Sequence, residues 1–351
     1  GGEGRAAEAP PPRKYVPPQM RKAMAAGGAA ALADPALLDA PTASSSSTAA
    51  PVTLPSHESA GNSRYGYCVH QGPRPSMEDA VDASARLGGA AVEFYAVYDG
   101  HSGTQAVKYV KWRLPLEICK RTSFESKESI EKALHDAFTS TDAGLLQDLA
   151  RAKPEPKPGE SSPKAGDAPK GSYVLSSGCV GCVVLVRDSN VHVANLGDCR
   201  AVLCNDGEML PLTADHRPEV HDGERQRLLD VGVEVSSDGY VHGRIGVSRA
   251  FGDWAWDAEE KCKGLICQPD VAEAEIVDTS EFLLLACDGI FEKLSTKEAG
   301  QIVRRRLRAT GDAKAAAEGL VKMAEKSNGS DNLSAIVVLF KKPESALDGG
   351  R

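Results

Sequence analysis

The chain has 351 residues, of which 41% are hydrophobic, and a formal net charge of -8. This length suits one large domain or two ordinary ones, and the acidic balance argues against non-specific binding to nucleic acid, which needs a basic surface. No run of about 18 apolar residues occurs, so we expect no membrane span.

The nine cysteines are scattered, and most of them lie inside apolar runs. This pattern is typical of buried thiols in a reducing compartment and not of a disulfide scaffold. Cys179 and Cys182 form a C-x-x-C pair, but they fall within a strand-like run and no second ligand pair follows. We therefore interpret them as buried side chains, not as a zinc or redox site. The expected location is cytoplasmic, nuclear or both.

Composition divides the chain into an arm, a domain and a tail. Residues 1–60 are rich in Ala, Pro, Gly and Ser and lack periodic apolar residues, which predicts a disordered arm. A single folded domain is expected over residues 61–342, with a surface insertion at 152–171 that is rich in Pro and Lys. A polar tail follows at 343–351.

Within the domain, apolar runs predict strands, in chain order, at 64–72, 80–87, 93–98, 173–186, 190–195, 200–205, 281–287 and 330–340. Helical periodicity and helix-start signals predict helices at 102–120, 126–150, 219–231, 295–308 and 313–326. The turn at 196–199 is expected to join two strands as a hairpin. Because strands come in runs with helix pairs between them, the order favours an α+β fold with largely antiparallel sheets.

One apolar stretch ends abruptly in residues that carry chemistry. The run EFYAVY is followed at once by Asp99, Gly100 and His101, and Ser102 with Gln105 three positions later is a helix-start signal. We therefore expect a buried strand with an acid and an imidazole at its end. A carboxylate taken out of water costs several kcal/mol unless a cation neutralises it, so a cationic partner is expected.

Further acids stand at the ends of predicted strands, namely Glu78, Asp79, Asp198, Asp288 and Asp331. Any one of them is typical of a solvated turn, but together, beside strands this apolar, they indicate a carboxylate cluster. Such a cluster needs cations, because like charges at close range raise one another's pKa. Oxygen ligands without His or Cys in ligand spacing favour Mg²⁺ or Mn²⁺ over zinc or copper.

The expected chemistry is hydrolysis of a phosphate ester. Two divalent ions about 4 Å apart hold a phosphoryl oxygen and lower the pKa of a bridging water. Arg74 is a candidate to hold phosphate oxygens, and His101 is a candidate to protonate the leaving alkoxide. The structural alternatives are a surface charge for Arg74 and an ordinary buried imidazole for His101.

At these residues the sequence resembles the metal-dependent protein phosphatase family, the type 2C serine/threonine phosphatases. The motifs occur in the family's order over about residues 64–341, and they read RPSMED, YAVYDGHSG, LGDCRAVL, LTADHRP, GVSRAFGD, LLLACDG and SDNLSAIVV. The resemblance implies an αββα sandwich with a metal site at one sheet edge. It also implies phosphorylated protein substrates, direct attack by a metal-bridging hydroxide, and no phosphoenzyme. We expect a monomer.

The resemblance assigns the main metal ligands position by position. It implies that Asp99 bridges both ions and that the backbone carbonyl of Gly100 binds one of them. Glu78 would hold the same ion through water. Asp288 and Asp331 match the ligands of the other ion.

The remaining roles also come from the resemblance. Asp198 matches an acid tied to a third, weaker ion, and Asp79 matches a residue that orients metal-bound water. Arg74 matches the phosphate-binding arginine and His101 the general acid. Glu292 stands where the family usually has Asp. The resemblance therefore does not decide whether this chain has the third ion site, although the carboxylate is kept.

Two alternatives remain from the sequence. Cys68 and Arg74 fit C-x5-R, the spacing of cysteine-dependent phosphatases, although Pro73 removes one backbone N–H from the loop that would bind phosphate. The other alternative is an inactive protein that uses the same fold as a scaffold. None of the main metal ligands is missing, which favours an enzyme.

Overall fold

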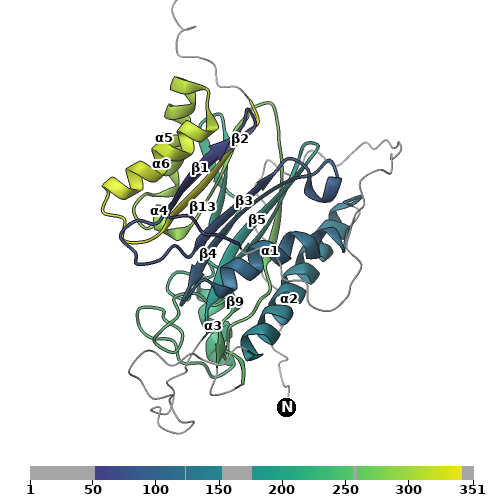
Figure 1. Cartoon of the computed structure of the whole chain (residues 1–351), viewed down its shortest axis with the longest axis vertical. Coiled ribbons are helices and arrows are strands. Elements are labelled where there is room, and N and C mark those ends of the chain that lie inside the picture. The colour runs from purple at the N-terminus through teal and green to yellow at the C-terminus, as the bar shows by residue number, and fades with distance from the viewer. Residues whose placement is uncertain (1–51, 123, 152–175, 256–258, 342–351) are drawn as a thin grey trace, which may run out of the picture. The chain divides into compact units, whose positions relative to one another are not determined.

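The computed structural model describes residues 52–122, 124–151, 176–255 and 259–341 (Figure 1). Most of the predicted arm at 1–60, the insertion at 152–171 and the tail at 343–351 lie outside these ranges. Among the helices that are described, none is both long enough and apolar enough to cross a membrane.

The fold is built on two sheets in which neighbouring strands run antiparallel. The first sheet has six strands, in the spatial order β1 (His57–Gly61), β2 (Tyr65–His70), β14 (Leu333–Leu339), β13 (Ser280–Ala286), β7 (Arg200–Asn205) and β8 (Glu208–Pro211). The second contains β12 (Asp270–Glu275), β6 (Asn190–Leu196), β5 (Gly178–Arg187), β4 (Glu93–His101) and β3 (Asp79–Ser84), with β9 (Phe251–Gly252) paired to β5. A separate two-stranded ribbon joins β10 (Trp254–Ala255) and β11 (Glu260–Lys261).

Side-chain alternation along the central strands explains the layering. In β4, Tyr95 and Val97 face the core between the two sheets, whereas Phe94 and Tyr98 face the core beneath the helices. Strands that are covered on both faces are apolar at nearly every position. This is why β4 and β5 appear in the sequence as continuous apolar runs.

Helices cover the outer face of each sheet (Figure 1). Their bounds are α1 (Gln105–Cys119), α2 (Lys127–Arg151), α3 (Asp222–Asp230), α4 (Asp288–Phe291), α5 (Thr296–Thr310) and α6 (Ala313–Lys326), with a short 3₁₀ helix at Leu87–Gly89. α1 and α2 pack on the second sheet, and α5 and α6 pack on the first. The layers therefore run helix, sheet, sheet, helix, and the expected α+β sandwich is confirmed.

The predicted start of α5 is confirmed in detail. The Ser295 side chain accepts a hydrogen bond from the Glu298 backbone N–H, and the Glu298 carboxylate accepts one from the Ser295 backbone N–H. This reciprocal capping box satisfies donors that the first turn of a helix otherwise leaves without partners. At the other end, Gly311 takes the left-handed conformation that commonly ends a helix.

The segment at 196–199 does not form the predicted hairpin. β6 ends at Leu196 in the second sheet and β7 begins at Arg200 in the first, so the chain crosses between the sheets here. The prediction was wrong because a Gly-Asp turn between apolar strands gives the same local signal whichever sheet the next strand joins. The crossover places Asp198 between the two sheets.

The predicted N-cap at Ser102 is also wrong. β4 continues to His101, which still pairs with Gly178 of β5 and so remains extended. Ser102 then takes a left-handed conformation with φ 59°. The residue before α1 is Thr104, whose side chain makes no capping hydrogen bond.

β1, β8 and β12 were not predicted, and β1 overlaps the residues expected to be a disordered arm. Each of these strands lies at the edge of its sheet. Edge strands have one side free of a neighbour and bury little apolar surface, so their sequences lack the alternation that marks central strands. The β1 sequence, HESAG, is an example.

Candidate active site

Acids from both sheets meet at one end of the sandwich. Asp79 and Asp99 are directly opposite on β3 and β4, Asp288 follows β13, Asp331 lies before β14, and Asp198 lies in the crossover. The pKa of Asp99 is well above its ordinary value, because the protein removes it from water and because Asp79, Asp288, Asp198 and Asp331 act on it with their negative charges. We call these residues the acidic cluster.

The acidic cluster opens to solvent on one side. Asp79 and Asp198 are buried, whereas the side chains of Asp288 and Asp331 are 21% and 27% exposed. A ligand from solution would therefore meet Asp288 and Asp331 first.

A residue of the first sheet, Ser334 of β14, fixes the Asp79 carboxylate. Its Oδ2 accepts a hydrogen bond of 2.7 Å from the Ser334 hydroxyl. Burial raises the pKa of Asp79 to about 7; hydrogen bonds from Ser334 and Cys287 oppose this shift, and the charge of Asp331 adds to it.

Glu78 lies beside the turn that follows β4. Its carboxylate accepts hydrogen bonds from the Ser76 hydroxyl at 2.8 Å and from the Gly103 N–H at 3.3 Å. Its backbone carbonyl accepts the Gly100 N–H at 3.0 Å, and its own N–H donates to the Asn332 side chain at 2.7 Å. Glu78 and Gly100 are thus fixed to each other and to the start of β14.

Arg74 reaches the open side of the acidic cluster. Its Nη2 donates to Asp331 Oδ2 at 2.5 Å, and its Nε donates to the Ser330 carbonyl at 3.1 Å. The side chain is 53% exposed. The sequence identified Arg74, but it did not predict this ion pair with Asp331.

Arg217 is a cation that the sequence reasoning missed. Its Nη1 lies 3.0 Å from Asp198 Oδ2 and 3.4 Å from Asp288 Oδ2. Burial raises the pKa of Asp198, and the Arg217 charge opposes that rise. Arg217 lies in the motif LTADHRP, and the expectation of a cationic partner for buried acids could have drawn attention to it.

His101 pairs with Asp253, another residue that the sequence reasoning missed. Its Nε2 lies 2.8 Å from Asp253 Oδ1, and the Asp253 side chain is 1% exposed. Burial lowers the pKa of His101, but the Asp253 charge and hydrogen bond more than offset this, so the pKa lies above its ordinary value. Asp253 therefore favours the protonated imidazole that a general acid requires.

The backbone that carries Asp253 is braced by α2 and β11. Gly252 and Asp253 both have positive φ, 76° and 55°. Asp142 of α2 accepts the Gly252 N–H at 2.8 Å, and the Lys261 ammonium donates to the Gly252 carbonyl at 2.8 Å and to Asp142 at 3.1 Å. This buried network compensates for the strained conformation and fixes Asp253 against His101.

Glu292 lies one helical turn after Asp288 in the same segment, where its N–H donates to the Asp288 carbonyl at 2.7 Å. The pKa of Asp288 is well above its ordinary value, because of burial and then the charges of Asp198 and Glu292. The Glu292 carboxylate therefore lies close enough to Asp288 and Arg217 for its charge to act on both.

The acidic cluster fits hard divalent cations by its chemistry. It offers only oxygen donors, and its negative charges outnumber the neighbouring guanidinium groups of Arg74 and Arg217. Within the described ranges, no group of three or more His, Cys, Asp or Glu residues is arranged so that it could already hold an ion.

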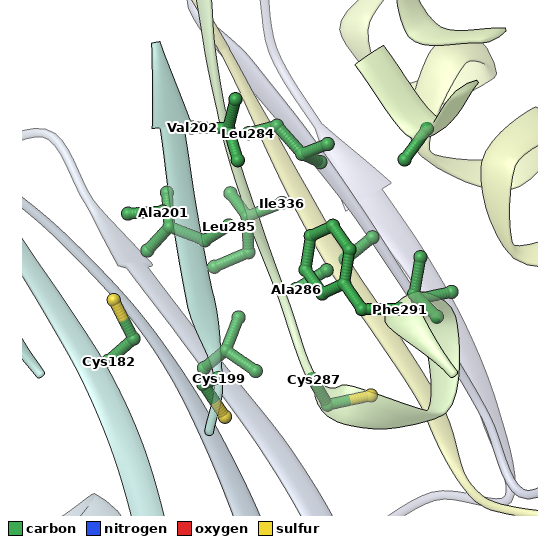
Figure 2. Close-up of a cluster of buried hydrophobic side chains, with 14 of the residues drawn as sticks. Cys182, Cys199, Ala201, Val202, Leu284, Leu285, Ala286, Cys287, Phe291 and Ile336 are labelled. Atoms are coloured by element: carbon green, nitrogen blue, oxygen red, sulfur yellow. The ribbon is translucent and has the colours of Figure 1, made fainter. Parts of the chain in front are cut away.

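The cysteines are free thiols, and most are buried. Figure 2 shows Cys182, Cys199 and Cys287 in one buried apolar cluster that also contains Leu285. Cys179 packs in the core on the other face of β5, so the two thiols of the C-x-x-C pair point in opposite directions. They cannot share an ion, and the interpretation as buried side chains is confirmed.

The structure also argues against Cys68 as a nucleophile, because its thiol is buried. Cys68 lies within β2, is 1% exposed, and burial raises its pKa to about 12. A cysteine nucleophile needs a lowered pKa and access to substrate.

The chain is similar to known proteins both in sequence and in fold. The family model described as protein phosphatase 2C matches residues 63–333. The chain is 34% identical over 309 residues to "Probable protein phosphatase 2C 2" of Oryza sativa subsp. japonica, covering 82% of this chain and 74% of that protein. It is 32% identical over 290 residues to "Probable protein phosphatase 2C 27" of Arabidopsis thaliana, covering 79% of this chain and 69% of that protein.

Solved structures share the fold. The serine-threonine phosphatase 2C from Toxoplasma gondii superposes with a TM-score of 0.61 and 21% identity, covering 83% of this chain and 98% of that one. A C. elegans sex determining protein superposes with a TM-score of 0.64 and 19% identity, covering 80% of this chain and 65% of that one. From the family match and the curated relatives, the chain belongs to the protein phosphatase 2C family.

Proposed function

We propose that this chain is an active, metal-dependent phosphatase that hydrolyses phosphoserine and phosphothreonine in protein substrates. The observation that carries the proposal is the meeting of Asp99, Asp288 and Asp331 at one solvent-facing end of the sandwich. Acids from three separate parts of the chain have no structural reason to converge, because their mutual repulsion costs stability. A site for cations accounts for the arrangement.

The proposed ligands are those that the resemblance implied. Asp99 would bridge two Mg²⁺ or Mn²⁺ ions, Asp288 and Asp331 would bind one of them, and Gly100 and Glu78 would hold the other. Asp79 lies directly opposite Asp99 and would orient water there. When bound, the ions would supply the activated water for direct in-line attack on phosphorus and neutralise charge as it develops.

The Asp198 side of the acidic cluster is the proposed location of a third, weaker ion. Asp198 and Glu292 both act on Asp288 with their negative charges. Glutamate is longer than aspartate by one methylene group, but it keeps the oxygen donor that such an ion prefers.

Arg74 is proposed to bind the phosphate of the substrate. Its guanidinium lies at the exposed rim of the acidic cluster, next to Asp331. A planar guanidinium can donate two parallel hydrogen bonds to phosphate oxygens. This contact would hold the ester in place and offset its negative charge.

His101 is proposed to protonate the leaving serine or threonine oxygen. The Asp253 carboxylate, 2.8 Å from Nε2, raises the pKa of the imidazole and orients the ring. Proton donation to a leaving alkoxide is worth about 10²–10⁴-fold in rate. Asp253 thus positions His101 and does not itself contact the substrate.

The proposal is tested with the variants Asp99→Asn and Asp288→Asn. Turnover of a phosphoserine peptide with Mn²⁺ should fall by orders of magnitude in both, while the circular dichroism spectrum stays that of wild type. Asp278→Asn is the matched control, because Asp278 is an exposed acid in the turn before β13, at the other end of that strand from Asp288.

A chelator should abolish wild-type activity, and alkylation of thiols should spare it. Equal inactivity of wild type and Asp99→Asn on phosphoserine, phosphothreonine and generic esters would instead favour an inactive scaffold.

A further inference from the structure

The Arg217 guanidinium bridges two acids that belong to different parts of the fold. Asp198 comes from the crossover between sheets, and Asp288 comes from the end of β13. The Nη1 atom of Arg217 lies 3.0 Å from one carboxylate and 3.4 Å from the other. Among the described residues, these are the ion pairs that Asp198 and Asp288 form.

The backbone, not only the long side chain, sets this position. The neighbouring residue His216 is fully buried, and its N–H donates to the Gly197 carbonyl at 2.9 Å while its Nδ1 accepts the Gly197 N–H at 3.0 Å. Its carbonyl accepts hydrogen bonds from the Ser248 N–H at 2.8 Å and hydroxyl at 3.0 Å. Arg217 is therefore tied to the same crossover that carries Asp198.

The Arg217 guanidinium and its partner Asp198 are largely shielded from solvent. The Arg217 side chain is 22% exposed and the Asp198 side chain 6% exposed, so solvent screens the pair only in part. By contrast, Arg74 pairs with one acid and is 53% exposed. The Arg217 guanidinium lies within ion-pair distance of both Asp198 and Asp288, whose carboxylates repel each other.

We propose that Arg217 is a built-in counter-cation of the acidic cluster, which competes with a divalent ion for Asp198 and Asp288. The inference rests on the proposed function, in which these two acids are metal ligands. Arg217 then has two opposite effects. It stabilises the metal-free protein, and it weakens binding of the ion on the Asp198 side.

An ordinary structural ion pair would have only the first effect, so the two must be measured together. Binding of Mn²⁺ alone to the full chain is followed by the electron paramagnetic resonance signal of the free ion, and thermal unfolding is followed in chelator. Arg217→Gln removes the charge and keeps polar bulk, whereas Arg217→Lys keeps the charge without the fork of two nitrogens. Arg305→Gln, at an exposed position of α5, is the matched control.

The expected result is that Arg217→Gln tightens the weaker Mn²⁺ site by about tenfold, which corresponds to ~1.4 kcal/mol. The same variant should melt at a lower temperature than wild type in chelator. Arg217→Lys should lie between the two, and Arg305→Gln should match wild type in both measurements.

Unchanged or weaker Mn²⁺ binding in Arg217→Gln would overturn the inference, and it would leave the proposed function standing as long as wild type binds Mn²⁺ and Asp288→Asn does not. Absence of Mn²⁺ binding in wild type would remove the metal assignment itself, and the inference with it. Should Arg217→Gln not fold, unchanged binding in Arg217→Lys overturns the inference instead.

Discussion

Replacing Gly178 by alanine is expected to disable His101 while the fold persists. Gly178 pairs with His101 across β5 and β4. A methyl group at this position would lie 2.2 Å from His101 Nε2 and 2.4 Å from Asp253 Oδ2. Because non-bonded atoms settle at about 3.5–4.0 Å, the imidazole has to move by more than about 1 Å or lose its carboxylate partner.

The size of the effect follows from that displacement. A misplacement of about 1 Å costs about 10²-fold in rate when the displaced group takes part in the reaction. Overpacking a core position costs about 1–3 kcal/mol, so Gly178→Ala should melt at a lower temperature but still fold.

The assay compares two leaving groups, a phosphoserine peptide and an activated aryl phosphate. An alkoxide needs a proton in order to leave, whereas a nitrophenolate does not, so the variant should lose about 10²-fold on the peptide and much less on the aryl ester. Gly223→Ala is the control, because its nearest contact is the His221 side chain at 3.2 Å. Equal losses on both substrates would refute the reasoning, as would full activity on the peptide.

Further predictions concern Asp253 and the start of α5. His101 must be protonated to donate, so turnover of a phosphoserine peptide falls as pH rises through its pKa; because Asp253 holds that pKa up, Asp253→Asn should move the alkaline decline of kcat to lower pH. An unmoved decline would exclude His101 as the titrating acid. Ser295→Ala removes one half of the capping box with Glu298 and should cost about 0.5–2 kcal/mol of unfolding free energy in urea, without loss of activity. Lys297→Ala, in the same turn, should cost less, and equal losses would argue against the cap.

The central strands and five of the helices (α1, α2, α3, α5 and α6) could be predicted because their signals are local. Alternation or continuous apolarity marks β2, β4, β5, β13 and β14, and the α5 capping box is contained within four consecutive residues, Ser295–Glu298. The edge strands β1, β8 and β12 gave no such signal, because their sequences lack the alternation of central strands. The crossover at Asp198 was predicted as a hairpin because the choice of sheet depends on residues far away in the chain.

The acids of the candidate site could be found from sequence, but their partners could not. Each acid lies at or near the end of a strand, which is a local feature. By contrast, the Asp253 partner of His101 lies 152 residues away, and the Asp288 partner of Arg217 lies 71 residues away. Nothing near either residue shows which charge the fold will bring to it.

The division of the acids between the two sheets has a mechanical consequence. Asp79 and Asp99 are carried by the second sheet, whereas Asp288 and Asp331 are next to strands of the first. Asp198 lies in the crossover that joins the two sheets. A small shift of one sheet relative to the other would change the distances between the carboxylates of the first sheet and those of the second. Substitutions in the core between the sheets, far from the acidic cluster, would then lower activity as well as stability. Cations bound by acids of both sheets would raise the free energy of unfolding.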